Sequence, residues 1–411
     1  MDVVSPIAPK PAADAPDPLV TALHATPQRM VMAFAGAGAQ ALARLHAVGG
    51  SSRTVLEARD VYAARSMTEW VGFAPRRMTT PRVASAMAEA AWRRARHLVE
   101  GEEGPAPVFG VGVSAAIATD RPKKGGHRVM LAVRDALGTA SYALTFEKGA
   151  RDRAGEEAVV TQLVLRAVAD ACGVLGAPRP ELGERERVEE GFRPTALLAA
   201  FAAQERAFVV VREDGAVAGA LPAAAGGSRA ERSGAPPTPV ILSGAFNPVH
   251  DGHRELLRVA VERVGPAALP LFELPLVNAD KSPIGAAEGR RRAQQFVGRT
   301  PVVLTHEPLF VAKAELFPGS VFVIGADTAE RIVDPRYYRN DPEKVKQALG
   351  ALRAHGCRLL VAGRRVEGRM LTLADIAAPA GYEDLFEAIP EDAFRSDLSS
   401  TQVRRRWPDP A

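Results

Sequence analysis

The sequence predicts an α/β protein of two domains, the second of which is a doubly wound, mostly parallel sheet. Two stretches, residues 18–179 and 238–411, each alternate short apolar runs with amphipathic segments of helical period. This alternation is typical of α/β layers. Between them lies AAAGGSRAERSGAPPTP, a stretch without periodicity that is typical of a flexible linker. A chain of 411 residues is long enough for two or three domains that each bury a core.

The N-terminal half begins with a tail and continues as an α/β layer domain. Residues 1–17 are rich in proline and poor in large apolar side chains, so we expect a disordered tail there. In residues 18–179 the apolar pattern predicts helices at 20–45, 83–98 and 155–171, and strands at 54–62, 108–118 and 129–132.

The segment 180–237 is expected to connect the two domains. Its charge pattern predicts a helix at 181–190, and a second helix is expected at 194–204. Asp214 and Gly215 then lie between two apolar runs, as in a hairpin turn. The linker described above ends this segment.

The C-terminal domain, residues 238–411, starts with the apolar run VILSG. Further runs at 269–277, 301–304, 321–325 and 357–363 alternate with helical segments. Apolar strands separated by helices are typical of a parallel sheet that is covered on both faces.

Composition excludes several classes of protein. The 52 basic and 48 acidic residues give a net charge of only +4 and are interleaved, so we expect no nucleic-acid partner. Cys172 and Cys357 lie too far apart for a CxxC zinc pair, which favours a reducing, cytoplasmic setting. No uncharged apolar run reaches 18 residues, and the first twenty residues do not resemble a signal peptide. We therefore expect no membrane partner.

A polar loop follows the first predicted strand of the C-terminal domain, where residues 243–253 read SGAFNPVHDGH. Ligands of open α/β sheets bind beyond the carboxyl ends of strands, and free amides at a helix start favour an anion. His250 and His253 flank Gly252, which lets the chain approach closely, so both imidazoles can face one phosphate. The candidate phosphate site also includes Ser243, Gly244, Ala245 and the backbone of Phe246.

Two other interpretations of the histidines stay open. An HxxH pair could be half of a metal site, although no third ligand occurs at a suitable spacing. The two histidines could also be loop residues without a function.

The string GAFNPVHDGH resembles the GxFxPxHxGH signature of the nucleotidylyltransferase superfamily, most closely that of nicotinamide and nicotinate mononucleotide adenylyltransferases. The second signature of that superfamily, ISSTxIR, is similar to LSSTQVR at 398–404. Ser399, Ser400 and Thr401 are good N-cap residues that can hold phosphate oxygens, and Arg404 adds a permanent positive charge. An ordinary capped helix with a basic face is the alternative. The resemblance covers residues 238–411 and implies a Rossmann-like fold.

The resemblance implies two further nucleotide contacts. Gly325 and Asp327 match a GxD that contacts the ribose, although Asp327 could also be a helix N-cap. Lys281 lies where the family places a lysine that faces the ATP phosphates. An exposed loop lysine is the alternative, and Lys313 and His306 are near enough in sequence to take that role.

The N-terminal domain resembles the CinA C-terminal family, through LHAVGGSS at 45–52, Tyr62, GVGV at 110–113 and FEKG at 146–149. Active members of that family deamidate nicotinamide mononucleotide with a serine. In this sequence Ala35 stands in place of the serine and Met67 in place of a lysine, so acyl chemistry by this route is not expected. The domain could instead bind a pyridine nucleotide through residues 36–38, serve in oligomerisation, or be a structural remnant.

Together these resemblances imply an enzyme of NAD biosynthesis. It would transfer the adenylyl group of ATP to nicotinamide or nicotinate mononucleotide and release pyrophosphate, with Mg²⁺ accompanying ATP and no metal held by the protein. His250, His253 and Arg404 are the expected catalytic residues. The alternatives are a nucleotidyltransferase for another phosphorylated acceptor and a nucleotide-binding sensor without turnover. The sequence is compatible with a homo-oligomer.

Overall fold

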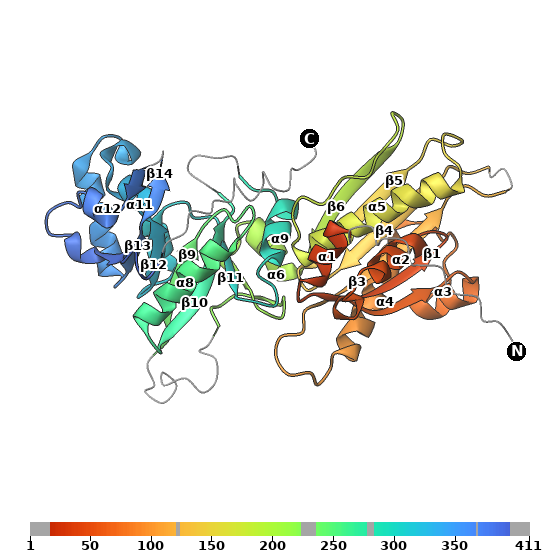
Figure 1. The fold of residues 1–411 in the computed structure, drawn as a ribbon, viewed down its shortest axis with the longest axis horizontal. Coiled ribbons are helices and arrows are strands. Elements are labelled where there is room, and N and C mark those ends of the chain that lie inside the picture. Colours follow the sequence, from red (N-terminus) through yellow and green to blue (C-terminus); the bar gives the residue numbers. More distant parts are fainter. Residues whose placement is uncertain (1–16, 121–123, 223–235, 278–282, 367–368, 395–411) are drawn as a thin grey trace, which may run out of the picture. The chain divides into compact units, whose positions relative to one another are not determined.

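The computed structural model describes residues 17–120, 124–222, 236–277, 283–366 and 369–394, and the chain forms two compact units (Figure 1). The first unit includes Gly110–Val133 and Tyr142–Glu189. The second includes Glu190–Ala411 together with two earlier segments, Gly101–Phe109 and Arg134–Ser141. Residues 1–16 of the predicted tail and most of the predicted linker lie outside the described residues, whereas Asp17 caps the helix that follows it.

The first sheet has six strands in the order β2-β1-β3-β4-β5-β6, and five helices accompany it (Figure 1). The strands are β1 Arg29–Ala35, β2 Val55–Asp60, β3 Val108–Ala116, β4 Arg128–Arg134, β5 Gly138–Thr145 and β6 Arg187–Pro194. The helices are α1 Pro18–His24, α2 Ala39–Ala47, α3 Ala64–Val71, α4 Pro81–Leu98 and α5 Arg153–Cys172.

Close packing between β3 and α4 explains two glycines of this unit. A Cβ atom on Gly110 would lie 2.2 Å from the carbonyl oxygen of Ala88, and one on Gly112 would lie 2.5 Å from that of Ala84. Both distances are too short for non-bonded atoms, so the strand and the helix can approach only because neither position carries a side chain.

The structure corrects two predicted helices of the N-terminal half. The stretch predicted as a helix at 20–45 contains strand β1, because a short, fully apolar run such as MVMAF fits a buried strand as well as a helix. The predicted charged helix at 181–190 is wrong over its whole length, because residues 181–186 form a turn and irregular structure and β6 begins at Arg187. The side chains of β6 are mostly half-buried or exposed, so its sequence lacks the apolar signal of a strand.

The second sheet has eight strands in the order β16-β13-β12-β9-β10-β11-β7-β8. These strands are β7 Phe208–Val211, β8 Val217–Ala218, β9 Thr238–Ser243, β10 Ala268–Pro275, β11 Val302–Thr305, β12 Val321–Gly325, β13 Arg358–Ala362 and β16 Phe386–Ile389. The helices of this unit are α6 Ala196–Ala202, α8 Asp251–Val264, α9 Ala286–Gln294, α10 Phe310–Leu316, α11 Ala326–Val333 and α12 Pro342–Ala354. A separate ribbon pairs β14 Arg364–Val366 with β15 Arg369–Leu371.

Six neighbouring strands of this sheet are parallel, and their order is that of a Rossmann fold. Counted from β9 along the chain, the order is 3-2-1-4-5-6. The prediction of a doubly wound parallel sheet is therefore confirmed. The predicted hairpin is present as β7 and β8, and β7 pairs antiparallel with β11, so the hairpin extends this sheet.

Helices cover both faces of the second sheet. Along β9, Val240 and Leu242 pack in one cluster with the apolar face of α8, whereas Ile241 packs in another with α10, α11 and α12. Alternate residues of a strand point to opposite faces, so one central strand contributes to both cores.

Candidate functional site

The candidate site of the second unit lies where the strand order of the sheet reverses. In the order 3-2-1-4-5-6, the reversal falls between β9 and β12, which are neighbours in the sheet. Their carboxyl ends are Ser243 and Gly325. Ligands of doubly wound folds bind in the crevice that forms at this point. Both residues belong to stretches that the sequence selected as nucleotide contacts.

We use the name phosphate loop for residues 244–249, which join β9 to His250 and α8. A Cβ atom on Gly244 would lie 2.8 Å from the ring of Phe246, so this position requires glycine. The ring of Phe246 is buried and meets Phe272 and Phe296 edge-on, at centroid distances of 5.3 and 5.2 Å. Phe246 also has a φ of +43°, an uncommon backbone conformation for a residue other than glycine. Its ring therefore belongs to the core, and only its backbone is placed to face a ligand.

Side chains at the C-terminal end of α9 hold the phosphate loop. Gln295 accepts a hydrogen bond from the Val249 amide at 2.8 Å and donates one to the Phe246 carbonyl oxygen at 2.9 Å. Arg292 donates to the Ala245 carbonyl oxygen at 3.1 Å. These bonds satisfy buried backbone groups of an irregular segment, which would otherwise destabilise it.

The two histidines stack at the start of α8. His250 is the N-cap residue and His253 is at the third helical position, and their ring centroids lie 3.7 Å apart. The His250 amide donates to Nδ1 of His253 at 3.2 Å. Because Nδ1 of His253 accepts this bond, a neutral ring carries its proton on Nε2. The structure therefore brings the two predicted imidazoles together and places the proton of a neutral His253 on Nε2.

Both imidazoles favour the neutral form. Burial, followed by the positive charges of His250, Arg364 and Arg254, lowers the pKa of His253 to about 3. Burial also lowers the pKa of His250, and Asp251 opposes that shift only in part. At neutral pH the pair can thus donate hydrogen bonds, while the surrounding positive charge comes from arginines.

Arg364 is a residue of this site that the sequence did not reveal. It lies in the β14–β15 ribbon, and its guanidinium contacts both carboxylate oxygens of Asp327 at 3.1 and 3.2 Å. Asp327 therefore accepts hydrogen bonds from Arg364 in this structure. Arg364 is half exposed. No local signal distinguishes it from its many neighbouring arginines, whereas Arg254, directly after the second histidine, could have been found from the motif.

Lys313 and His306, the two alternatives to Lys281, both have partners within the protein. The ammonium of Lys313 is buried, pairs with Glu273 at 2.7 Å, and lies 3.4 Å from the hydroxyl of Ser243. His306 stacks on Phe201 with a centroid distance of 4.2 Å. The carboxyl end of β9, at Ser243, thus lies next to a buried ion pair. The predicted contacts Lys281, Ser399, Ser400, Thr401 and Arg404 lie outside the described residues.

Among its described residues, the site has few groups that could hold a metal ion. In the part of the chain that the structure describes, no three His, Cys, Asp or Glu side chains gather closely enough to bind one. Asp251 is exposed and pairs with Arg254, and Asp327 pairs with Arg364.

The first unit contains a pocket of about 450 Å³ at the carboxyl end of β1. Phe34, Gly36, Asp60, Tyr62, Arg153 and Glu157 are among its lining residues. Ala35 has no hydroxyl group, and Met67 lies in the core with only 1% of its surface exposed. The pocket therefore offers neither a serine nor a lysine at the two positions that the CinA resemblance marks.

Two backbone amides beside that pocket, which could otherwise bind an anion, donate hydrogen bonds to a side chain of the protein. The amides of Gly38 and Gln40, at the start of α2, donate to the Glu157 carboxylate at 2.8 and 3.3 Å. A carboxylate at a helix N-terminus takes the place that a phosphate would otherwise occupy. This arrangement disfavours a nucleotide phosphate at residues 36–38.

Part of the second unit matches a known family model. Residues 241–406 match the family model described as cytidylyltransferase-like, and this span includes both sequence motifs. The match supports nucleotidyl transfer in general. No curated protein matches the sequence. Among the helices that the structure describes, none is both long enough and apolar enough to span a membrane.

Several solved structures are similar to part of the chain. The competence/damage inducible protein CihA from Agrobacterium tumefaciens is 19% identical, with a TM-score of 0.29, over 36% of this chain and 91% of that chain. A competence-damaged (CinA) superfamily protein from Escherichia coli is 16% identical, with a TM-score of 0.27, over 37% and 85% of the two chains. A competence or damage-inducible protein from Enterobacter asburiae is 15% identical, with a TM-score of 0.26, over 37% and 88%.

Proposed function

We propose that the chain transfers the adenylyl group of ATP to nicotinamide or nicotinate mononucleotide and releases pyrophosphate. The observation that carries the proposal is the stacked pair His250 and His253 at the start of α8, beside the phosphate loop and at the reversal point of a Rossmann-type sheet. The cytidylyltransferase-like match over the same residues supports the reaction class. The adenine base and the pyridine acceptor rest on the sequence resemblance.

In the proposed reaction, an oxygen of the acceptor phosphate attacks the α-phosphorus of ATP. A new P–O bond forms as the bond from the α-phosphorus to the bridging oxygen breaks, and pyrophosphate leaves with that electron pair. The attacking oxygen is already an anion, so no side chain has to remove a proton. Positioning and charge stabilisation then determine the rate.

The proposal gives the neutral histidines the role of hydrogen-bond donors. Nε2 of His253 can donate to a non-bridging oxygen of the α-phosphate, where negative charge develops in the transition state. Arg254 and Arg364 add positive charge nearby. Ser399, Ser400, Thr401 and Arg404 are proposed to hold the β- and γ-phosphates.

Magnesium enters this reaction with the substrate. Mg²⁺ prefers oxygen ligands and usually binds through phosphates with only one or two carboxylates, which suits a site whose described carboxylates are paired with arginines. Bound as Mg·ATP, it would neutralise charge on the phosphates.

A panel of donors and acceptors tests the proposal. Pyrophosphate release by the full chain should be fastest with ATP and one of the two pyridine mononucleotides. His253→Ala should lower kcat about 10²- to 10³-fold, because one preorganised donor is lost. Turnover with CTP or with another phosphorylated acceptor would identify a different nucleotidyltransferase, and nucleotide binding without turnover would identify a sensor. Full turnover by His253→Ala would remove the role given to that histidine.

We further propose that the first unit does not deamidate nicotinamide mononucleotide. Ala35 and Met67 support this, because neither supplies a nucleophile or an ammonium group. The full chain should release no ammonia from nicotinamide mononucleotide above the rate of a heat-denatured sample. Enzymatic ammonia release would contradict the proposal.

A further inference from the structure

Helix α9 carries polar side chains on two opposite sides. Arg290 and Gln294 lie four residues apart, so they share one side of the helix, and Arg292 and Gln295 share another. At about 100° per residue, the mean directions of the two pairs differ by roughly 150°. The pair Arg292 and Gln295 holds the phosphate loop, as described above.

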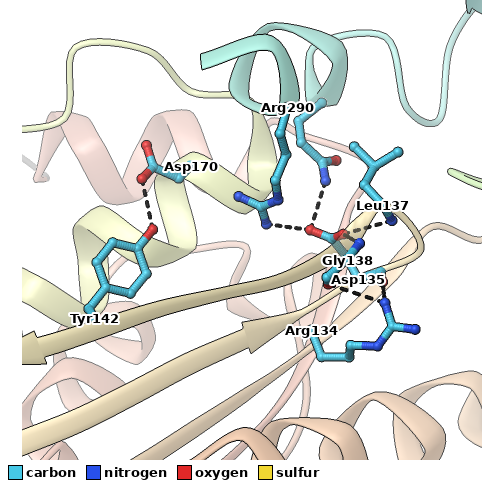
Figure 2. Close-up of polar contacts among 8 residues, drawn as sticks. Arg134, Asp135, Leu137, Gly138, Tyr142, Asp170 and Arg290 are labelled. Carbon is cyan, nitrogen blue, oxygen red and sulfur yellow. Dashed lines mark hydrogen bonds and ion pairs between the residues drawn. The ribbon is translucent and has the colours of Figure 1, made fainter. Parts of the chain in front are cut away.

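The other side of α9 binds a buried carboxylate, that of Asp135 (Figure 2). Arg290 forms an ion pair with Oδ2 of Asp135, and Gln294 donates to the same oxygen at 2.9 Å. All three residues are at least 95% buried. A charge-assisted contact of this kind is strong, and a buried arginine left without its carboxylate is costly.

Asp135 is itself held by the turn in which it lies. The turn belongs to the segment Arg134–Ser141, which is part of the second unit. Oδ1 of Asp135 accepts hydrogen bonds from the amides of Leu137 and Gly138 at 2.8 and 3.0 Å, as Figure 2 shows. The carboxylate therefore joins a fixed turn, through Oδ1, to α9, through Oδ2.

From these contacts we propose that Asp135 is a positioning residue for the phosphate loop. Asp135 fixes the rotation and position of α9 from one side, and α9 fixes residues 244–249 from the other. His250 follows Val249 directly, so a displacement of the loop moves the stacked histidines with it. Misplacement of a catalytic group by about 1 Å can lower a rate about 10²-fold. The rate predictions rest on the proposed function, whereas the loop predictions do not.

Asp135→Asn in the full chain is the decisive variant. Its carbonyl oxygen can still accept from Leu137 and Gly138, but its amide group now faces two donors on α9. Hydrogen exchange followed by mass spectrometry should show about tenfold faster exchange in the peptide 244–250. Pyrophosphate release should show a kcat lowered about 10- to 100-fold, with a smaller change in KM.

Two further variants separate positioning from general destabilisation. Glu190→Gln removes an exposed ion pair between Glu190 on β6 and Arg291 on α9. This variant should change neither loop exchange nor kcat by more than about twofold. The double variant Asp135→Asn/Arg290→Met should be no slower than Asp135→Asn, because Arg290 is proposed to act on the loop through its pairing with Asp135.

The outcomes are distinct. Loop exchange equal to wild type in Asp135→Asn overturns the proposal, even if the melting temperature falls. Faster loop exchange in a chain whose wild type shows no nucleotidyl transfer keeps the positioning role and rejects the proposed function. If Asp135→Asn does not fold, Gln294→Leu replaces it, since it removes one of the two contacts and keeps the ion pair. Faster exchange in that variant supports the proposal, and unchanged exchange overturns it.

Discussion

At the scale of single residues, His253 shows how burial determines a protonation state. Nothing in the HxxH spacing indicates whether its imidazole is charged. In the structure the ring is largely buried, stacks on His250 and lies near Arg364 and Arg254, so its pKa falls to about 3. The motif thus acquires its electrostatic character from burial and from the distant Arg364 as well as from its own residues.

Stability should therefore depend on His253 in acid. The unfolded chain takes up a proton at this histidine near its ordinary pKa of about 6.5, whereas the folded chain does so only near 3. The contribution to the free energy of unfolding is complete above pH 6.5 and declines as pH falls towards 3, by at most about 1.4 kcal/mol per pH unit. His253→Asn, whose side-chain oxygen can still accept from the His250 amide, should show a shallower decline in denaturant titrations.

The exposed His97 of α4 provides the matched control. His97→Asn should keep the pH dependence of wild type between pH 3 and 6.5. An equally steep decline in His253→Asn would show that this imidazole does not titrate as the structure indicates.

At the scale of elements, the ion pair between Lys313 and Glu273 joins α10 to β10 beneath the end of β9. Glu273 also accepts a hydrogen bond from the Thr305 hydroxyl on β11. A charged pair with almost no exposed surface depends on both partners.

Removing one partner should destabilise the second unit strongly. Lys313→Met leaves an unpaired buried carboxylate and should lower the free energy of unfolding by about 3–5 kcal/mol. Glu273→Gln/Lys313→Met should recover much of this loss, because no buried charge remains. Lys346→Met, which breaks an exposed pair with Glu343 on α12, should leave the melting temperature unchanged. Thermal unfolding of the three variants checks this, and equal effects at Lys313 and Lys346 would contradict it.

The elements of the second unit could largely be predicted from the sequence, and those of the first less well. Strands β9 to β13 are short apolar runs separated by polar helices, so the apolar pattern and the length of each run both indicate a strand. Strand β1 is just as apolar, and Pro27 and Gly36 bound it, but so short an apolar run also fits a buried helix, and β6 is mostly polar. A helical segment could be expected where α9 lies. The two sides through which α9 forms hydrogen bonds could not be predicted, because their partners come from other parts of the chain.

At the scale of the whole molecule, the sequence predicted two α/β layers and one phosphate site, and the fold prediction is confirmed. The phosphate loop and the two histidines could be identified from the sequence because they form one contiguous motif. Arg364, Gln295 and Asp135 were not, because a doubly wound sheet brings together segments that are far apart in the sequence. Candidate residues near a motif can thus be identified from the local sequence, whereas the residues that orient them can be identified only from the folded structure.

The antiparallel strand β7 determines where a stable fragment of this protein can begin. Residues Phe208–Val211 pair with Val302–Thr305, so a fragment that starts at residue 238 would leave the apolar strand β11 with unsatisfied amides and carbonyls. Such an open strand can template pairing with another chain and lead to aggregation. The two-residue β8 outside β7 offers little surface for that pairing. A fragment of the second unit should therefore retain the hairpin, and it should also retain Arg134–Ser141, so that Arg290 keeps its partner Asp135.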